Sequence, residues 1–296
     1  MTQRPRRVCI VVNPIAGRGR AGVLAAATGE LLVASGCEVE RHETRSPRHA
    51  SELAADAARR AFDVVLACGG DGTVNDCVQG LVASDTALAV MPLGTANVLG
   101  HELALRADPE HVTRLVVDGR RRRLDLGRCG DDYFLCVAGV GFDAAVAEEM
   151  ERRRTGVITL ASWVGPTWHT FWRYGFEPLE VRIDGVLIDG AVRHLLIGNT
   201  RSYGGPFVIT PHARPDDGLL DACAFGAPGK LALALYMAAT IPHVHHHLRG
   251  VTCAAGRRIE VTAKRPVPVQ LDGDYRTTTP VTFEVVPGAV TVLSNR

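Results

Sequence analysis

The chain lacks any apolar run long enough to span a bilayer. Its best candidate, residues 231–241, is roughly half of the about 20 residues that a membrane-spanning helix needs. A signal peptide is also missing, because the opening residues MTQRPRR lead into a short strand and not into a long apolar segment. The formal charge is only +1, without the basic excess typical of a nucleic-acid binder. These absences predict a cytoplasmic protein that binds no nucleic acid.

Cysteine pairs at metal-site or redox-site spacing are missing as well. The eight cysteines are scattered without a CxxC motif. Most lie in apolar, strand-like segments, where cysteine acts as a small hydrophobic residue. We therefore expect reduced thiols in the cytoplasm. The histidine-rich run at residues 243–247 has no cysteine or carboxylate nearby, so we interpret it as a loop and not as a metal site.

A length of 296 residues predicts two domains. Residues 1–123 alternate strands and helices, which predicts an α/β domain with a parallel sheet. The expected strands are 8–12, 37–43, 63–68 and 87–91, and the expected helices are 21–35, 50–61 and 74–82. Ligands bind beyond the carboxyl ends of such strands, where loops 13–22, 69–76 and 92–97 follow.

Residues 124–296 predict a mainly β, sandwich-like domain, with the last few residues free to return to the first domain. Turn signals at 130–132 and 184–185 indicate hairpins, and helices are expected at 230–240 and from residue 143 onward. The expected strands are 124–129, 133–140, 180–183, 186–188, 193–198, 219–225, 258–263, 267–271, 281–286 and 290–293.

Aromatic and basic residues gather in a few segments. All three tryptophans lie within residues 163–172. Packing in the core and a position at a membrane interface explain this cluster equally well. The arginine runs 120–123 and 152–154 are interpreted as solvated faces, with contact to anionic lipid headgroups as the second reading.

The most informative motif is Gly69-Gly70-Asp71-Gly72-Thr73-Val74-Asn75-Asp76, between a predicted buried strand and a predicted helix. Glycines leave no Cβ to keep a phosphate from the main chain, and backbone N–H groups at a helix start bind anions. A carboxylate among them opposes an anion, so we expect a cation such as Mg²⁺, or a water, beside Asp71. The motif predicts a phosphate site.

A second glycine pattern gives a weaker indication of a different function. Residues 17–22 match G-x-G-x-x-G after a strand, with acidic residues at Glu38 and Glu40, so an NAD(P)-dependent oxidoreductase is an alternative. The dinucleotide fingerprint, however, needs its first glycine directly after the strand. Here residues 13–16 intervene, and Pro14 disfavours helix at the residue before it.

These motifs together resemble the diacylglycerol kinase catalytic-domain family, specifically the bacterial soluble lipid kinases that are similar to sphingosine kinases. The resemblance runs nearly from end to end, through Asn13–Gly17, Thr44, Gly69–Asp76, Pro92–Asn97, Asp125–Gly127, Gly139–Ala144, Gly198-Asn199, Tyr203–Gly205, Asp216–Asp221 and Leu271–Gly273.

The resemblance implies an ATP-dependent lipid kinase with its nucleotide in the cleft between two domains. It places ATP against Asn13, Thr44, Gly69, Gly70, Asp71, Gly72, Thr73, Val74, Asn75 and Thr95. It also implies a structural Mg²⁺ held by the Asp217 carboxylate and the carbonyls of Arg214 and Leu219, a donor set of oxygens that suits a hard cation.

Asp272 is implied as the general base facing the lipid hydroxyl. A free Asp has a pKa of about 3.9 and is therefore ionised at neutral pH, as a base must be. The family usually has Glu two residues later, where this chain has Asp274. That shorter side chain leaves a weakly active lipid-binding regulatory protein as a further alternative.

The implied partner is a lipid at the membrane surface. We expect transient association of a cytoplasmic protein with the inner face of the membrane. A diacylglycerol-like lipid is favoured as substrate, although phosphatidylglycerol, a sphingoid base and a polyprenol also stay open. Whether the chain forms a homodimer also stays open.

Overall fold

The computed structural model of the chain describes residues 6–153, 160–204, 207–226 and 229–295. Two residues of the motifs above, Arg154 and Gly205, lie outside the described residues. The chain divides into two compact units. Unit 1 contains the residues up to Leu124 and those from Gly288 onward, and unit 2 contains Asp125–Pro287.

Unit 1 is built on a parallel sheet, which confirms the predicted α/β class. Its strands run in the order β2-β1-β3-β4 and are parallel throughout. They are β1 (Arg7–Val12), β2 (Glu38–Glu43), β3 (Val64–Gly69) and β4 (Ala87–Pro92). Strands β1 and β3 are almost wholly apolar and buried, because helices cover both faces of such a sheet.

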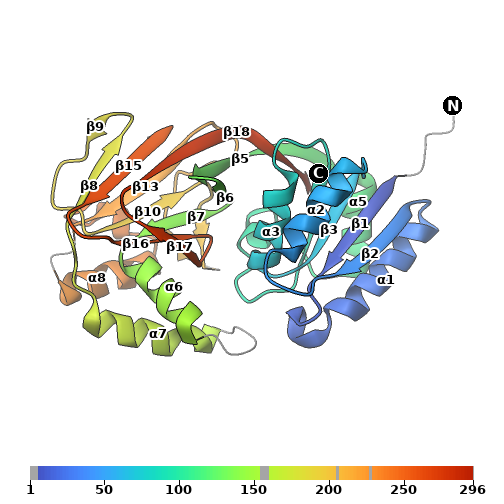
Figure 1. Cartoon of the computed structure of the whole chain (residues 1–296), viewed down its shortest axis with the longest axis horizontal. Helices are drawn as coiled ribbons and strands as arrows, with labels where there is room; N and C mark the ends of the chain where they lie inside the picture. Colours follow the sequence, from blue (N-terminus) through green and yellow to red (C-terminus); the bar gives the residue numbers. More distant parts are fainter. Residues whose placement is uncertain (1–5, 154–159, 205–206, 227–228, 296) are drawn as a thin grey trace. The chain divides into compact units, whose positions relative to one another are not determined.

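The helices of unit 1 pack in two pairs (Figure 1). Helix α1 (Ala21–Ala34) packs against α5 (Pro109–Asp118), and α2 (His49–Arg59) packs against α3 (Asp71–Leu81). The short helices η1 (Ala16–Gly19) and α4 (Val98–Glu102) follow β1 and β4. Both short helices therefore lie at the carboxyl end of the sheet, where ligands bind in this architecture.

Unit 2 is mainly β. One sheet has the antiparallel order β14-β13-β10-β7-β16-β17. Its strands are β7 (Val137–Val140), β10 (His194–Gly198), β13 (Leu220–Phe225), β14 (Val251–Gly256), β16 (Pro268–Leu271) and β17 (Asp274–Thr278). The opposing sheet uses β8 (Leu179–Ile183), β9 (Val186–Leu187), β15 (Arg258–Ala263) and part of β18 (Val281–Ser294).

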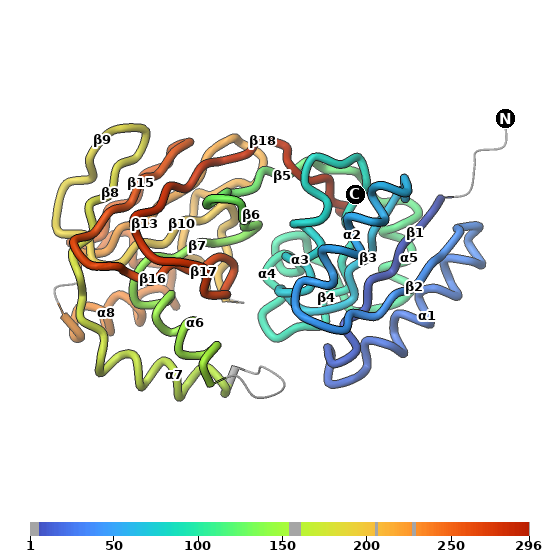
Figure 2. Tube along the Cα trace, in the orientation of Figure 1, coloured from blue at the N-terminus to red at the C-terminus, as the bar shows by residue number. Residues whose placement is uncertain are grey.

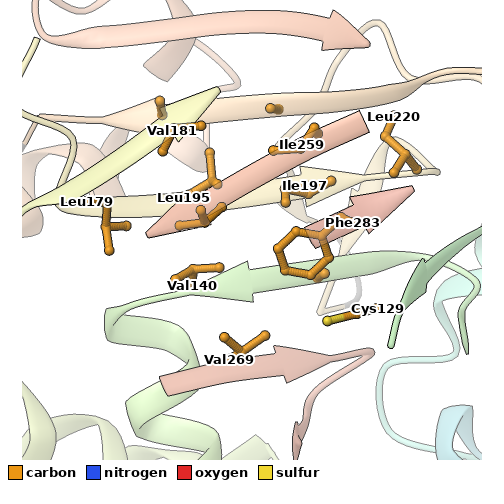
Figure 3. Packing of buried hydrophobic residues seen from close by; sticks show 14 of the residues in the cluster. Cys129, Val140, Leu179, Val181, Leu195, Ile197, Leu220, Ile259, Val269 and Phe283 are labelled. Atoms are coloured by element: carbon orange, nitrogen blue, oxygen red, sulfur yellow. The ribbon is translucent and has the colours of Figure 1, made fainter. Parts of the chain in front are cut away.

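The core of unit 2 lies between these two sheets. Figure 3 shows Val140, Leu195 and Ile197 of the first sheet packed with residues of the second, among them Ile259 and Phe283. This packing confirms the predicted sandwich-like domain. Further elements of unit 2 are β6 (Asp132–Phe134), β11 (Ser202–Tyr203), β12 (Phe207–Val208), α6 (Phe142–Arg153), α7 (Leu160–Arg173), α8 (Lys230–Thr240) and η2 (His245–His247).

Strand β18 differs from its prediction. The sequence predicted two strands, 281–286 and 290–293, separated by Pro287-Gly288, but β18 runs through both residues. It pairs with β15 over Val281–Glu284 and with β4 at Val292. It also pairs with β5 (Arg120–Cys129), and the Arg123 side chain donates to the Gly288 carbonyl at 3.4 Å. Similarly, β5 begins inside the arginine run that was interpreted as a solvated face.

Two cysteines also differ from expectation. Cys223 and Cys253 form a disulfide between β13 and β14, where the strand register places them directly opposite each other with Cα atoms 4.3 Å apart. The expectation of unpaired thiols is therefore wrong for this pair. Among the residues that the structure describes, the remaining cysteines (Cys9, Cys37, Cys68, Cys77, Cys129 and Cys136) are not part of a disulfide.

Candidate active site

Three loops meet at the carboxyl ends of β1, β3 and β4 in unit 1. The Gly17 N–H donates to the Leu93 carbonyl at 2.9 Å, and the Leu93 N–H donates to the Gly69 carbonyl at 2.8 Å. The Asn13 amide donates to the Thr73 hydroxyl at 3.2 Å. The loops that the sequence pointed out as separate candidates thus form one hydrogen-bonded surface, the three-loop site, at the start of α3.

The glycines of the GGDG motif have different tasks. A Cβ on Gly69 would clash with the Thr73 hydroxyl oxygen, and one on Gly70 would lie 2.9 Å from the Gly94 Cα. Both glycines are thus required by packing within the three-loop site. A Cβ on Gly72 would meet nothing within 4 Å among the described residues. Gly72 is the glycine that leaves room for an incoming group at the first turn of α3.

Asp71 joins two of the loops. Its carboxylate accepts hydrogen bonds from the backbone N–H groups of Asn97, at 2.8 Å, and Val98, at 2.6 Å. Burial raises the pKa of this carboxyl, and the two N–H donors oppose the rise. The sequence placed Asp71 beside a cation, whereas the structure turns its oxygens toward the start of α4, because unpaired N–H groups at a helix N-terminus attract a carboxylate.

Asn97 completes this link, although the sequence did not single out its side chain. Its backbone adopts a left-handed φ of 48°. Its side-chain oxygen accepts from the Gly94 N–H at 2.6 Å, and its amide donates to the Gly94 carbonyl at 2.9 Å. The turn at 94–97 is thereby held against Asp71, and its signal in the sequence is the Asn itself, a residue that tolerates the left-handed backbone of turns.

The other predicted nucleotide residues lie around the same loops with unequal exposure. Thr95 is exposed in the turn at 94–97 and Thr44 is half-buried directly after β2. Thr73, Val74 and Asn75 are buried in the first turns of α3. They can support the loop, whereas Gly72 and Thr95 are exposed.

In unit 2, Asp272 lies in a tight turn between β16 and β17, with a left-handed φ of 49°. Its carboxylate accepts three backbone hydrogen bonds, from the N–H groups of Leu135 (2.7 Å), Cys136 (2.9 Å) and Val137 (2.9 Å). The three donors fix the direction of the carboxylate and stabilise its negative charge.

A buried polar cluster lies beside the Asp272 turn and supports it. The Gln270 side chain donates to Asp143 at 3.0 Å and accepts from the Gly273 N–H at 2.6 Å. The Tyr203 hydroxyl also donates to Asp143, at 3.3 Å, and the Nδ1 atom of His194 lies 3.6 Å from its other oxygen. Sequence reasoning missed these roles, although Asp143 and Tyr203 lie in motifs quoted above.

Burial governs the charges in this cluster. It lowers the pKa of His194, against the opposing effect of Asp143. Burial and, secondly, the charge of Asp143 raise the pKa of Tyr203 well above its usual value. A neutral imidazole and a neutral phenol therefore surround Asp143 at neutral pH, and we interpret the cluster as the support of the Asp272 turn.

The predicted metal loop, residues 214–219, is held by a second buried network. Asp125 accepts from the Gly218 N–H at 2.7 Å and donates its own N–H to the Pro215 carbonyl at 2.7 Å. The fully buried Asn199 amide donates to the Asp125 carbonyl at 2.8 Å. Three motifs that are distant in sequence thus converge on this loop.

The carboxylate proposed as the ligand is itself exposed. Asp217 accepts from the Leu219 N–H at 3.1 Å. Burial and, secondly, the charge of Asp217 raise the pKa of neighbouring Asp221 to about 6. Asp217 and Asp221 are thus two neighbouring carboxyl groups, and oxygen ligands of this kind are those that a hard cation prefers.

The histidine-rich run has a different environment. It contains the short helix η2, in which His245 is fully buried and its Nε2 atom lies 2.7 Å from the Ile209 carbonyl oxygen. Within the residues that the structure describes, no group of three or more His, Cys, Asp or Glu side chains is arranged to hold a metal. The run therefore takes part in packing.

Comparison with known proteins agrees with this geometry. Residues 7–129 match the diacylglycerol kinase catalytic domain, and residues 136–294 match the YegS C-terminal NAD kinase beta sandwich-like domain. The chain is 30% identical to a diacylglycerol kinase of Mycobacterium tuberculosis, over 98% of this chain and 96% of that protein. It is 26% identical to a diacylglycerol kinase of Bacillus subtilis, over 91% and 90%.

A solved structure shares the fold. The crystal structure of a diacylglycerol kinase from Bacillus anthracis matches 100% of this chain and 98% of that chain, with a TM-score of 0.76 and 20% sequence identity. At that identity the likeness concerns the fold alone.

Proposed function

This chain belongs to the diacylglycerol kinase catalytic-domain family and is a lipid kinase, and from that premise we propose that it transfers the γ-phosphate of ATP to the hydroxyl of a diacylglycerol-like lipid. The observation that carries the proposal is the three-loop site, in which Gly72 leaves open space at the first turn of α3. Backbone N–H groups at a helix start are suited to binding phosphate.

We assign the nucleotide to this site. The N–H groups of the first turn of α3 would receive the phosphates, with the exposed Thr95 hydroxyl beside them. Asn13 and Asp71 would act by holding the loops together. Phosphoryl transfer depends largely on such positioning and on neutralising phosphate charge, which Mg²⁺ supplies when bound with ATP.

We assign the general base to Asp272. Its carboxylate is held in place by three N–H donors that stabilise its charged form, and it would take the proton that leaves the lipid hydroxyl. Gln270 keeps the turn in position through the Gly273 N–H.

A structural Mg²⁺ would be held by Asp217 with the carbonyls of Arg214 and Leu219. Such a clamp stabilises the folded protein, because the unfolded chain lacks the preformed site. A bound cation would also stabilise the ionised form of the neighbouring Asp221 carboxyl, whose pKa is raised to about 6. We expect the protein to meet ATP and its lipid at the cytoplasmic face of the membrane.

Asp217→Ala should lower the melting temperature and abolish its rise when Mg²⁺ is added without nucleotide. In the wild type, the folded pKa of Asp221, about 6, is raised above its ordinary value. Ionising Asp221 therefore costs stability as pH rises toward and through that pKa, and a bound cation offsets this cost. The Mg²⁺-dependent rise should accordingly be larger at pH 7.5 than at pH 5. Melting curves with Mg²⁺ or chelator measure it, and equal responses of wild type and Asp217→Ala would place the metal elsewhere.

Asp274→Glu should raise kcat/KM several-fold. Asp274 is the first residue of β17, with a half-exposed side chain that lies 3.4 Å from the Arg276 guanidinium. One more methylene would extend the carboxylate toward a metal or phosphate, as in the usual family sequence. Asp274→Asn is the matched control and should not gain activity. An Asp274→Glu rate equal to wild type would show that the shorter side chain is not a handicap.

The substrate itself is identified by labelling. The protein is incubated with radiolabelled ATP and a total lipid extract from its source, and the labelled lipid is then identified by mass. A labelled phosphatidic acid supports the proposal. A different labelled lipid would change the substrate class, and tight NADH binding without any labelled lipid would favour an oxidoreductase.

A further inference from the structure

Two helices of unit 2 present apolar side chains to solvent. On α7, Val164, Trp168 and Trp172 are exposed, with 64% of Trp168 accessible. On α8, Leu231 and Leu235 are exposed, and 87% of Leu231 is accessible. We call these five residues, together with Ile241 after α8, the α7–α8 face.

The spacing of these residues makes the exposure continuous along each helix. Val164, Trp168 and Trp172 recur every four residues, as do Leu231 and Leu235, so each set lies on one side of its helix. The opposite side of α8 is apolar too, because Leu233, Tyr236 and Ala239 are buried. A helix that is apolar all round is normally covered on every side, so the outward side of α8 calls for a partner.

The two helices meet where α7 ends and α8 begins. The Lys230 ammonium donates to the Trp172 carbonyl at 2.8 Å and lies 4.9 Å from the centre of the Trp172 ring. Figures 1 and 2 show α7 and α8 on the same side of unit 2. Their exposed residues thus belong to neighbouring helices on one side of the unit, and exposed apolar surface of this kind marks an interaction site.

Within the two helices and their flanking segments the charges have one sign, although Glu149 of α6 lies 3.6 Å from His169 of α7. Residues 160–176 and 226–250 contain no Asp or Glu, whereas Arg173 and Lys230 lie at the junction of the two helices. By contrast, Arg152 and Arg153 of α6 are engaged in ion pairs with Glu148 and Glu149. The lipid contact that the sequence offered for run 152–154 is therefore better suited to the α7–α8 face.

We propose that the α7–α8 face docks unit 2 onto a bilayer that contains anionic phospholipid, an inference that rests on the proposed function because a lipid kinase must reach a substrate held in a membrane. Tryptophan favours the boundary between apolar and polar regions of a bilayer. Basic residues beside an apolar helix face are attracted by anionic headgroups. A second copy of the chain fits less well, since α7 and α8 carry no carboxylate of their own to pair with Arg173 and Lys230 of a facing copy.

Intrinsic fluorescence tests the docking directly, because all three tryptophans of the chain lie on α7. The full-length protein is mixed with vesicles of phosphatidylcholine alone, or of phosphatidylcholine with phosphatidylglycerol, each with and without brominated acyl chains. We expect a blue shift and bromine quenching, both stronger with phosphatidylglycerol. Absence of vesicle binding, or binding without quenching, would overturn the proposal.

A double variant, Leu231→Glu with Leu235→Glu, locates the contact. Both side chains are exposed, so the fold should tolerate the change, and melting curves verify this. Vesicle affinity should fall at least about tenfold, because inserting two leucine side chains is worth more than one factor of ten in binding. The matched control is Val23→Glu with Val33→Glu, two exposed positions on α1, which should bind vesicles like wild type. Equal loss in both variants would refute a specific face.

Two further measurements distinguish membrane docking from the lipid kinase activity on which it rests and from a contact between two copies of the chain. With a short-chain, water-soluble diacylglycerol, the leucine variant should keep wild-type turnover while losing activity on vesicle-borne lipid. If no lipid is phosphorylated at all, the proposed function fails, whereas vesicle binding still reports on docking. If the variant instead converts a dimer into a monomer and binds vesicles normally, the face is a contact between copies and the docking proposal is wrong.

Discussion

Asp272→Asn is expected to lower turnover by at least about 100-fold, as is typical when a general base is lost, while ATP binding stays nearly unchanged. An amide cannot take the proton from the lipid hydroxyl at neutral pH. The nucleotide is assigned to unit 1, whereas Asp272 and its three N–H partners all belong to unit 2. Single-turnover rates and calorimetric ATP titration measure the two effects.

The surroundings of Asp272 require a control for folding. Its two oxygens accept from Leu135, Cys136 and Val137, and an Asn would turn its NH₂ group toward at least one of these donors. Some loss of thermal stability is therefore expected with the loss of rate. Gln270→Leu provides the comparison, because it removes the support of the Gly273 N–H and leaves the carboxylate in place. Folded Asp272→Asn with near-normal turnover would assign the base elsewhere.

The strands and helices of unit 1 were largely predictable because each depends on local pattern. An apolar run followed by glycines predicted β3, the loop and α3, and the structure has all three. Helix α5 could have been predicted as well. Asp108 caps it by accepting from the His111 N–H, and Pro109 follows at its first position, which is a known signal of a helix start.

Contacts between residues far apart in the chain could not be predicted. The approach of Gly70 to Gly94 and the three donors to Asp272 depend on how the elements pack. The disulfide between Cys223 and Cys253 needs the register of β13 and β14, which no spacing in the sequence specifies. The sequence pointed to the motifs of the site, and only the fold shows which residues hold the loops together.

Asp71 illustrates the difference. From the sequence, a carboxylate among glycines indicated a nearby cation. In the structure the same carboxylate accepts from the Asn97 and Val98 N–H groups and ties the GGDG loop to α4. Asp71→Ala is therefore still expected to weaken nucleotide binding, but through loss of loop geometry.

Gly70→Ala and Gly72→Ala are expected to weaken ATP binding at least about tenfold for different reasons, since each costs charge-assisted hydrogen bonds to phosphate. A Cβ on Gly70 would lie 2.9 Å from the Gly94 Cα, so the loops must separate and thermal stability should fall. A Cβ on Gly72 enters open space within a helical turn, where Ala is about 1 kcal/mol better than Gly, so stability should hold or rise.

This contrast decides whether phosphate meets the first turn of α3. Calorimetric ATP titration gives the affinities, and melting curves without nucleotide give the stabilities. Gly29→Ala is the matched control, because it lies in the interior of α1 and its Cβ would make an ordinary contact 3.6 Å from Ile10. Weak ATP binding by stable Gly72→Ala would identify obstruction by a single methyl group. Wild-type affinity in Gly72→Ala, together with loss in Gly70→Ala, would mean that the loop shapes the site without its first turn touching phosphate.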